Sequence, residues 1–70
     1  MDFRVTYDPT ADAAYIYLTE IAPGAAVRQL LAREGITLDL DREDRLIGIE
    51  VLDATRNLPA PLVRDLVREG

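Results

Sequence analysis

Two aspartates stand on either side of a proline near the start of the chain, in the segment 7–12. Two carboxylates that share a site have pKa values pushed apart, and such a pair can divide the roles of general acid and general base. The competing interpretation is a turn, because Pro9 fixes φ at a turn position and Asp8 can accept a backbone N–H. Catalysis also needs a cleft, which nothing in the sequence indicates. We therefore predict structural roles in a turn for Asp8, Pro9 and Asp12.

A second group of acids has the spacing of a calcium-binding loop. The first, third, fifth and twelfth positions of an EF-hand loop would fall on Asp39, Asp41, Glu43 and Glu50. That loop requires glycine at its sixth position, where this chain has Asp44, and it requires flanking helices. Both flanks have the alternating pattern of strands instead, and alternation places the acids on the solvent face of a hairpin. We therefore predict no bound metal and no other cofactor.

The remaining composition restricts the chemistry further. The chain contains no His and no Cys, so the usual pairs of nucleophile and base are missing. Thirteen acidic residues against eight basic ones give a formal charge of −5, which repels phosphate backbones and anionic lipids. We predict no nucleic-acid partner and no membrane partner, and we favour a non-enzymatic protein. The alternative is a small hydrolase or metal-dependent enzyme that uses the clustered carboxylates.

Alternating side chains predict that strands position these residues. The first strand is expected at 2–7 and the second at 14–19, where aromatic and β-branched residues gather. The register that keeps apolar residues on one face pairs Phe3 with Leu18, Val5 with Ile16 and Tyr7 with Ala14. Residues 25–33 fit both a helix, by the spacing of Val27, Leu30 and Leu31, and a strand. We predict a strand there, because it keeps a continuous meander.

The clearest element is a hairpin between residues 36 and 51. Its register places six apolar residues on the core face and pairs Ile36 with Val51, Leu38 with Ile49 and Leu40 with Ile47. The connection is expected at 42–45, with Asp44 in the left-handed conformation. Beyond it, Asp53 is a candidate cap for a short turn, and a short amphipathic helix is predicted from the stripe Leu62, Val63, Leu66 and Val67.

The predicted fold is a single small α+β domain over residues 1–70. An antiparallel β-meander of about five strands carries the short C-terminal amphipathic helix on its surface. The sheet face opposite the core is mixed polar and aromatic, which is typical of protein interfaces. Arg4 is expected to face Tyr17 as a cation–π pair, and Gly48 is expected to leave a shallow space beside Asp39. The candidate interaction face consists of Arg4, Tyr15, Tyr17, Asp39, Gly48 and Glu50.

Three blocks of the sequence, 7–18, 35–41 and 45–54, together resemble the YuzE-like family of small bacterial proteins of unknown function. The resemblance covers residues 3–55 and implies a bacterial source, a compact antiparallel sheet with a C-terminal helical element, and a strand at 25–33. It supplies no activity and no catalytic residues. The chain departs from the family at Asp44, where glycine is typical, which implies a looser turn.

The size of the chain predicts self-association. At 70 residues, the free energy gained by burial and the cost of ordering the chain nearly cancel, and no disulfide or His/Cys metal site can add stability. We therefore expect at least a dimer. Proteins of this kind are suspected of acting as antitoxin-like partners of small toxins. The functional hypothesis is a cytoplasmic, acidic protein-interaction module that masks a basic protein, since no leader or membrane-length apolar run is visible.

Overall fold

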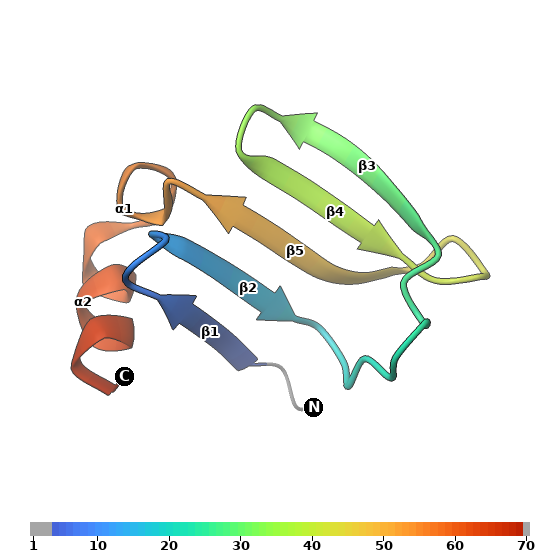
Figure 1. Cartoon of the computed structure of the whole chain (residues 1–70), viewed down its shortest axis with the longest axis horizontal. Coiled ribbons are helices and arrows are strands. Elements are labelled where there is room, and N and C mark those ends of the chain that lie inside the picture. Colours follow the sequence, from blue (N-terminus) through green and yellow to red (C-terminus); the bar gives the residue numbers. More distant parts are fainter. Residues whose placement is uncertain (1–3, 70) are drawn as a thin grey trace.

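The computed structural model describes residues 4–69 of the chain. It consists of an antiparallel sheet followed by two helices that lie at one end of it (Figure 1). The elements are β1 (Arg4–Asp8), β2 (Ala13–Tyr17), β3 (Arg28–Arg33), β4 (Ile36–Leu40), β5 (Leu46–Leu52), α1 (Ala54–Asn57) and α2 (Ala60–Glu69). The predicted α+β class, with antiparallel strands and a short C-terminal helix, is confirmed.

The five strands lie in the order β1-β2-β5-β4-β3 (Figure 1). The β1–β2 hairpin and the β3–β4–β5 meander are therefore joined side by side through β2 and β5. This order departs from a continuous meander at one junction, because β2 lies beside β5 and β3 lies at the far edge. The burial of the two strands agrees with this order, since β5 contains the buried residues Ile47, Gly48 and Val51 whereas all six residues of β3 are exposed. Strand β5 therefore lies in the interior of the sheet, and β3 lies at an edge.

The predicted registers are largely confirmed. Val5 pairs with Ile16 and Tyr7 with Ala14, whereas the predicted pairing of Phe3 falls outside the described residues. Within the 36–51 hairpin, the observed partners are Ile36 with Val51, Leu38 with Ile49, and Leu40 with Leu46. The prediction for Leu40 is wrong by one residue because the register shifts between Asp39 and Leu40. A β-bulge of this kind inserts an extra residue opposite one partner, which alternation alone cannot reveal.

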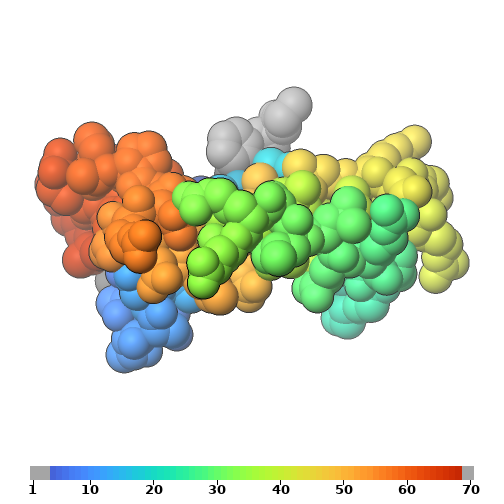
Figure 2. All heavy atoms as spheres, turned by 90° about the horizontal axis from the view of Figure 1, so that it is seen from above, coloured from blue at the N-terminus to red at the C-terminus, as the bar shows by residue number. Residues whose placement is uncertain are grey.

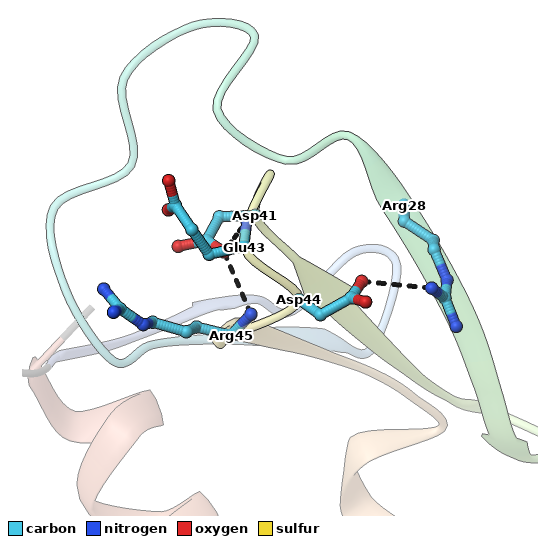
Figure 3. A network of polar contacts seen from close by, with 5 residues as sticks. All are labelled: Arg28, Asp41, Glu43, Asp44 and Arg45. Atoms are coloured by element: carbon cyan, nitrogen blue, oxygen red, sulfur yellow. Dashed lines mark hydrogen bonds and ion pairs between the residues drawn. The ribbon is translucent and has the colours of Figure 1, made fainter.

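The β4–β5 connection is organised by the side chain of Asp41 (Figure 3). One of its carboxylate oxygens, Oδ1, accepts hydrogen bonds from the backbone N–H groups of Glu43 and Arg45, each at 2.9 Å. Asp44 has a φ of 64°, which confirms the left-handed conformation expected there. The connection runs from 41 to 45 and is one residue longer than predicted, because Asp41 belongs to the turn that it stabilises.

The strand at 28–33 confirms the choice of strand over helix for this segment. Its pairing with β4 is interrupted by a register shift between Leu31 and Arg33. The helix-like spacing of leucines is misleading here, because β3 has no buried face that would impose strict alternation. Context from β4, rather than the local pattern, decides the conformation.

The hydrophobic core lies between one end of the sheet and the helices. It consists of Ala14, Val51 and Ala54, with the partly buried residues Val5, Tyr7, Ile16, Ile36, Ile49 and Leu58 packed around them. Helix α2 contacts β1, and α1 contacts both β5 and α2. Of the predicted stripe on α2, Val63 is buried whereas Val67 remains 55% exposed. The two helices together therefore cover the end of the sheet to which β1 and β5 belong.

Candidate functional site

The polar face of the sheet carries a row of residues that crosses all five strands. The paired residues in this row are Arg4, Tyr17, Gly48, Asp39 and Gln29, one from each of β1, β2, β5, β4 and β3. Residues directly opposite one another on adjacent strands project from the same face. The registers therefore bring five positions that are far apart in the sequence onto one line.

A second row runs beside the first, with Thr6, Tyr15, Glu50, Thr37 and Leu31 as its members. The two rows together contain all six residues of the predicted interaction face. Arg4 and Glu50 are exposed, Tyr15 and Tyr17 are half-buried, and Asp39 and Gly48 are buried. The two buried positions therefore shape this face from beneath rather than contacting solvent.

The two rows are connected by a hydrogen bond from Tyr15 to Asp39. The hydroxyl of Tyr15 donates to Oδ2 of Asp39, and Nε2 of Gln29 donates to Oδ1 of the same carboxylate at 2.9 Å. Asp39 is only 5% exposed. A buried carboxylate is costly unless it accepts hydrogen bonds, and here each of its two oxygens has a donor.

Gly48 makes this hydrogen bond possible. The side chain of Tyr15 passes directly over Gly48, and a Cβ atom at that position would overlap the tyrosine hydroxyl. The shallow space that we expected at Gly48 is therefore filled by Tyr15. A glycine at this position is required for side-chain passage, not for an unusual backbone conformation.

The environment of Tyr15 strengthens its role as a donor. Burial raises the pKa of the Tyr15 hydroxyl, and the hydrogen bond to Asp39 and the negative charge of that residue raise it further. A tyrosine with a raised pKa stays protonated throughout the neutral range. The hydroxyl therefore acts as a permanent hydrogen-bond donor to Asp39.

The aromatic side chains extend the network towards β1. The guanidinium carbon of Arg4 lies 4.2 Å from the centroid of the Tyr17 ring, as expected for a cation–π pair. The rings of Tyr15 and Tyr17 are 4.7 Å apart at an interplanar angle of 57°. The contacts therefore run continuously from Arg4 through two tyrosines to Asp39 and Gln29, and we call these five residues the polar network.

Asp8 participates in a local turn at the end of β1. Its Oδ1 accepts hydrogen bonds from the backbone N–H of Thr10 at 3.0 Å and from the Thr10 hydroxyl at 2.6 Å. These hydrogen bonds from Thr10 lower the pKa of the Asp8 carboxyl. The carboxylate is thus used within the turn that contains Pro9.

Asp12 connects the β1–β2 turn to α1. The Thr55 hydroxyl donates to Oδ2 of Asp12 at 2.7 Å, the Tyr7 hydroxyl donates to Oδ1 at 2.8 Å, and the Thr55 N–H donates to Oδ1 at 3.2 Å. The backbone N–H of Ala54 also donates to the Asp12 carbonyl oxygen at 2.9 Å. The hydrogen bonds from Thr55 and Tyr7 lower the pKa of Asp12. The hydrogen bond to Asp12 raises the pKa of Tyr7. Asp8 and Asp12 therefore have separate partners, and they do not share a proton-transfer site.

Asp53 lies at the N-cap position of α1, as expected for the cap of a short turn, but its side chain does not supply the capping hydrogen bond. The φ of Asp53 is 50°. The carboxylate of Asp12 instead accepts the N–H of Thr55 in the first turn. An acceptor from another part of the chain can satisfy a helix terminus as well as a local side chain can.

Two hydrogen-bond partners were not predicted from the sequence, Gln29 for Asp39 and Thr55 for Asp12, and only the first could have been found from strand pairing. Gln29 lies opposite Asp39, so a strand assignment for 28–33 is sufficient to identify it as a neighbour. Thr55 is 43 positions from Asp12, and no local pattern signals that contact. The difference lies in whether strand pairing determines the neighbour.

The acidic side chains of residues 4–69 do not gather into a metal site. Within that range, no group of three or more His, Cys, Asp or Glu side chains is placed to hold a metal ion. The acids with EF-hand spacing are separated, because Asp39 binds Tyr15 and Gln29 while Asp41 binds its own turn. None of the helices described is long and apolar enough to cross a bilayer.

The fold and the polar network define a small α+β protein with an open antiparallel sheet and an ordered polar face. The family model described as "Protein of unknown function (DUF2283)" matches residues 4–54, and the chain belongs to this family. The narrower YuzE-like resemblance stays a prediction. Neither a curated protein nor a solved structure matches the chain.

Proposed function

We propose that the protein is a non-enzymatic protein-interaction module and that the polar face of its sheet is the contact surface. The observation that carries the proposal is the polar network, in which Arg4, Tyr17 and Tyr15 are held in place by stacking and by the hydrogen bond to Asp39. Side chains that are ordered before binding lose less entropy when a partner arrives. Tyrosine and arginine are also enriched among the residues that dominate binding energy.

The chemistry of the face supports binding rather than catalysis. The Asp39 carboxylate has both oxygens occupied, and the raised pKa of Tyr15 keeps its proton in place near neutral pH. The Tyr15 hydroxyl is therefore unsuited to giving up a proton to a substrate near neutral pH. A preformed surface with satisfied polar groups is suited to recognising the shape and charge of a partner.

A basic protein is the partner class that the charge favours. The chain has a formal charge of −5, and Glu50 is exposed in the middle of the polar face. Complementary charge accelerates association and suppresses incorrect partners. This role agrees with an antitoxin-like function, in which an acidic protein masks a small basic one, and the protein acts in the cytoplasm in this proposal.

Site-specific photo-crosslinking in the host tests the proposal. A photoreactive amino acid in place of Thr6, which is exposed on the polar face, is expected to crosslink to a protein other than this chain. The same amino acid in place of Arg64, exposed on α2, serves as the reference position. The Thr6 crosslink should be lost in Glu50→Arg and retained in Asp65→Arg, which makes the same charge reversal on α2.

The opposite results contradict the proposal. If the Thr6 position crosslinks no more than the Arg64 position, or only to copies of the chain, the polar face does not bind a different protein. Equal loss of the crosslink in Glu50→Arg and Asp65→Arg would exclude a specific role for the polar face.

A further inference from the structure

Strand β3 forms one edge of the sheet and pairs with β4 on one side only. Figure 2 looks onto this edge, and the green atoms of β3 lie uncovered along the front of the molecule between the helices and the β4–β5 turn. An edge strand presents a row of backbone N–H and C=O groups that can pair with another strand. The β3 edge is therefore a candidate site for pairing with another strand.

Charged side chains, which usually protect an edge strand from pairing, occur only at the two ends of β3. Its only charged residues, Arg28 and Arg33, are both drawn towards their own chain. Nη1 of Arg28 lies 3.0 Å from Oδ1 of Asp44 (Figure 3), and Nη2 of Arg33 donates to Oδ1 of Asn57 at 2.5 Å. Charges in the middle of an edge strand discourage pairing, and the middle of this one is apolar.

Apolar side chains are exposed at the centre of β3. Leu31 is 72% exposed and Leu30 is 40% exposed, although they lie on opposite faces of the strand. The register shift beyond Leu31 affects only the last part of the strand, so residues 28–31 remain regular. A pairing strand would therefore find both a regular backbone and apolar side chains above and below it.

The accessible surface of the chain is larger than expected for a compact monomer of its mass. The accessible surface is 5206 Å², whereas a compact monomer of this mass is expected to expose about 4,400 Å². The excess of about 800 Å² matches the area that each partner contributes to an interface of standard size. A second copy of the chain would cover the part of this surface that lies along β3.

We propose that β3 pairs antiparallel with β3 of a second copy around a two-fold axis, which joins two five-stranded sheets into one continuous sheet. Antiparallel pairing of identical strands is closed by a two-fold axis, so the assembly ends at a dimer. Leu30 and Leu31 of each copy lie at the seam. The two Arg33 side chains lie at opposite ends of the seam, and each Arg28 keeps its ion pair with Asp44.

This dimer uses the edge of the sheet, and it meets the polar face assigned to a different protein only at Gln29 and Leu31, where the two rows end on β3. Both copies can present their polar faces at once, since edge pairing covers neither face of the sheet. The dimer also supplies the stability that a chain of this size lacks, because it removes exposed leucines and unpaired backbone groups from water.

Sedimentation equilibrium over a range of protein concentrations tests the dimer. The native chain is expected to show the mass of two copies, and Leu31→Arg is expected to raise the dissociation constant at least about tenfold by placing a charge at the seam. Because Leu31 is exposed, this variant should keep its circular dichroism spectrum. Val67→Arg, which alters an exposed valine on α2, is the matched control and should remain dimeric.

Hydrogen exchange at two protein concentrations locates the interface. Amides of residues 28–33 are expected to become more protected as the dimer forms, whereas those of α2 should not change. A monomer at every concentration, a dimer unaffected by Leu31→Arg, or unchanged exchange in 28–33 would each overturn the proposal.

Ionic strength separates this proposal from the proposed function. Two chains of charge −5 repel each other, so added salt should preserve or tighten the β3 dimer, whereas it should weaken the complex with a basic protein. Glu50→Arg should leave the dimer intact. Leu30→Arg, which alters the seam on the face opposite the polar rows, should leave the Thr6 crosslink intact. If Glu50→Arg dissociates the dimer and Leu31→Arg does not, the two copies meet through the polar face and the edge proposal is wrong.

Discussion

The two ends of the sheet are stabilised in different ways. At the β1–β2–β5 end, α1 and α2 cover the sheet and enclose the core formed by Ala14, Val51 and Ala54. At the β3–β4 end, the six residues of β3 are exposed, and Gln29 is held to β4 by its hydrogen bond to Asp39. One end therefore depends on apolar burial and the other on polar contacts across strands.

This difference shows how a very small protein can combine stability with an accessible surface. Apolar burial is non-directional and needs a covering layer, which ten residues of α2 supply at one end only. Hydrogen bonds and stacked rings need no covering layer, and they order the polar face while leaving it exposed. We expect the β3 edge to open locally more easily than the covered end, because local stability follows apolar contact.

The largest effect should come from truncation in the covered core. Val51→Ala is expected to destabilise the protein by about 2 kcal/mol, because Val51 is 2% exposed and its removal leaves a cavity beside Ala14 and Ala54. Val67→Ala makes the same chemical change at a residue that is 55% exposed, and it should cost less than about 0.5 kcal/mol. Urea denaturation measures both, and equal costs would show that the covered end is not the stabilising one.

A smaller effect is expected from Gly48→Ala at the centre of the polar face. The added Cβ would displace the Tyr15 hydroxyl and leave the buried Asp39 with one donor fewer, at a cost of about 1–2 kcal/mol. The cost should fall sharply when Gly48→Ala is combined with Tyr15→Ala, since neighbouring changes that share one cause are not additive. An additive double mutant would disprove the passage of Tyr15 over Gly48 as the reason for glycine.

Removal of the Tyr15 hydroxyl isolates the hydrogen bond within the polar network. Tyr15→Phe keeps the ring against Tyr17 but removes a donor to Asp39, and it should destabilise the protein by about 1 kcal/mol. Tyr17→Phe is the control, because it keeps the ring beneath Arg4, and its effect should be less than about 0.5 kcal/mol. Equal effects in thermal denaturation would mean that the hydroxyl of Tyr15 contributes nothing specific.

The smallest effect should appear as a dependence of stability on acid pH. The pKa of Asp12 is lowered in the folded protein by the hydrogen bonds from Thr55 and Tyr7. The contribution of Asp12 to the free energy of unfolding is therefore present above the unfolded pKa of about 4. It is lost as the pH falls through the lower pKa of the folded protein. Asp12→Asn should flatten the fall in melting temperature below about pH 4. Asp65→Asn makes the same change in net charge on α2, and a slope like that of Asp12→Asn would contradict this role of Asp12.

Much of the fold could be predicted because strand alternation contains the information. The pairings of Ile36 with Val51 and Leu38 with Ile49 follow from the need to keep apolar residues on one face. The shift that moves Leu40 from Ile47 to Leu46 could not be predicted, since a bulge preserves the composition of both strands. The pairing of β2 with β5 joins segments that are far apart, and it depends on the relative burial of whole strands rather than on any local pattern.

Some contacts of the candidate site could be predicted from the strand register, and others could not. The cation–π pair of Arg4 and Tyr17 follows directly from the predicted register, because these residues are directly opposite. The hydrogen bond from Tyr15 to Asp39 runs diagonally between two rows and requires the side chain to lie flat over Gly48. A register gives positions but not the directions of side chains. It therefore predicts an open space at Gly48, whereas the structure has the Tyr15 side chain there.

The position of β5 has a consequence for how the chain becomes ordered during synthesis. It is the last strand to leave the ribosome, yet it lies between the two hairpin partners that precede it, β2 and β4. The β1–β2 and β3–β4 pairs can form early from local contacts, but neither is aligned with the other until Leu46–Leu52 is available. The two parts of the sheet therefore become one sheet only when β5 pairs with β2 as well as with β4.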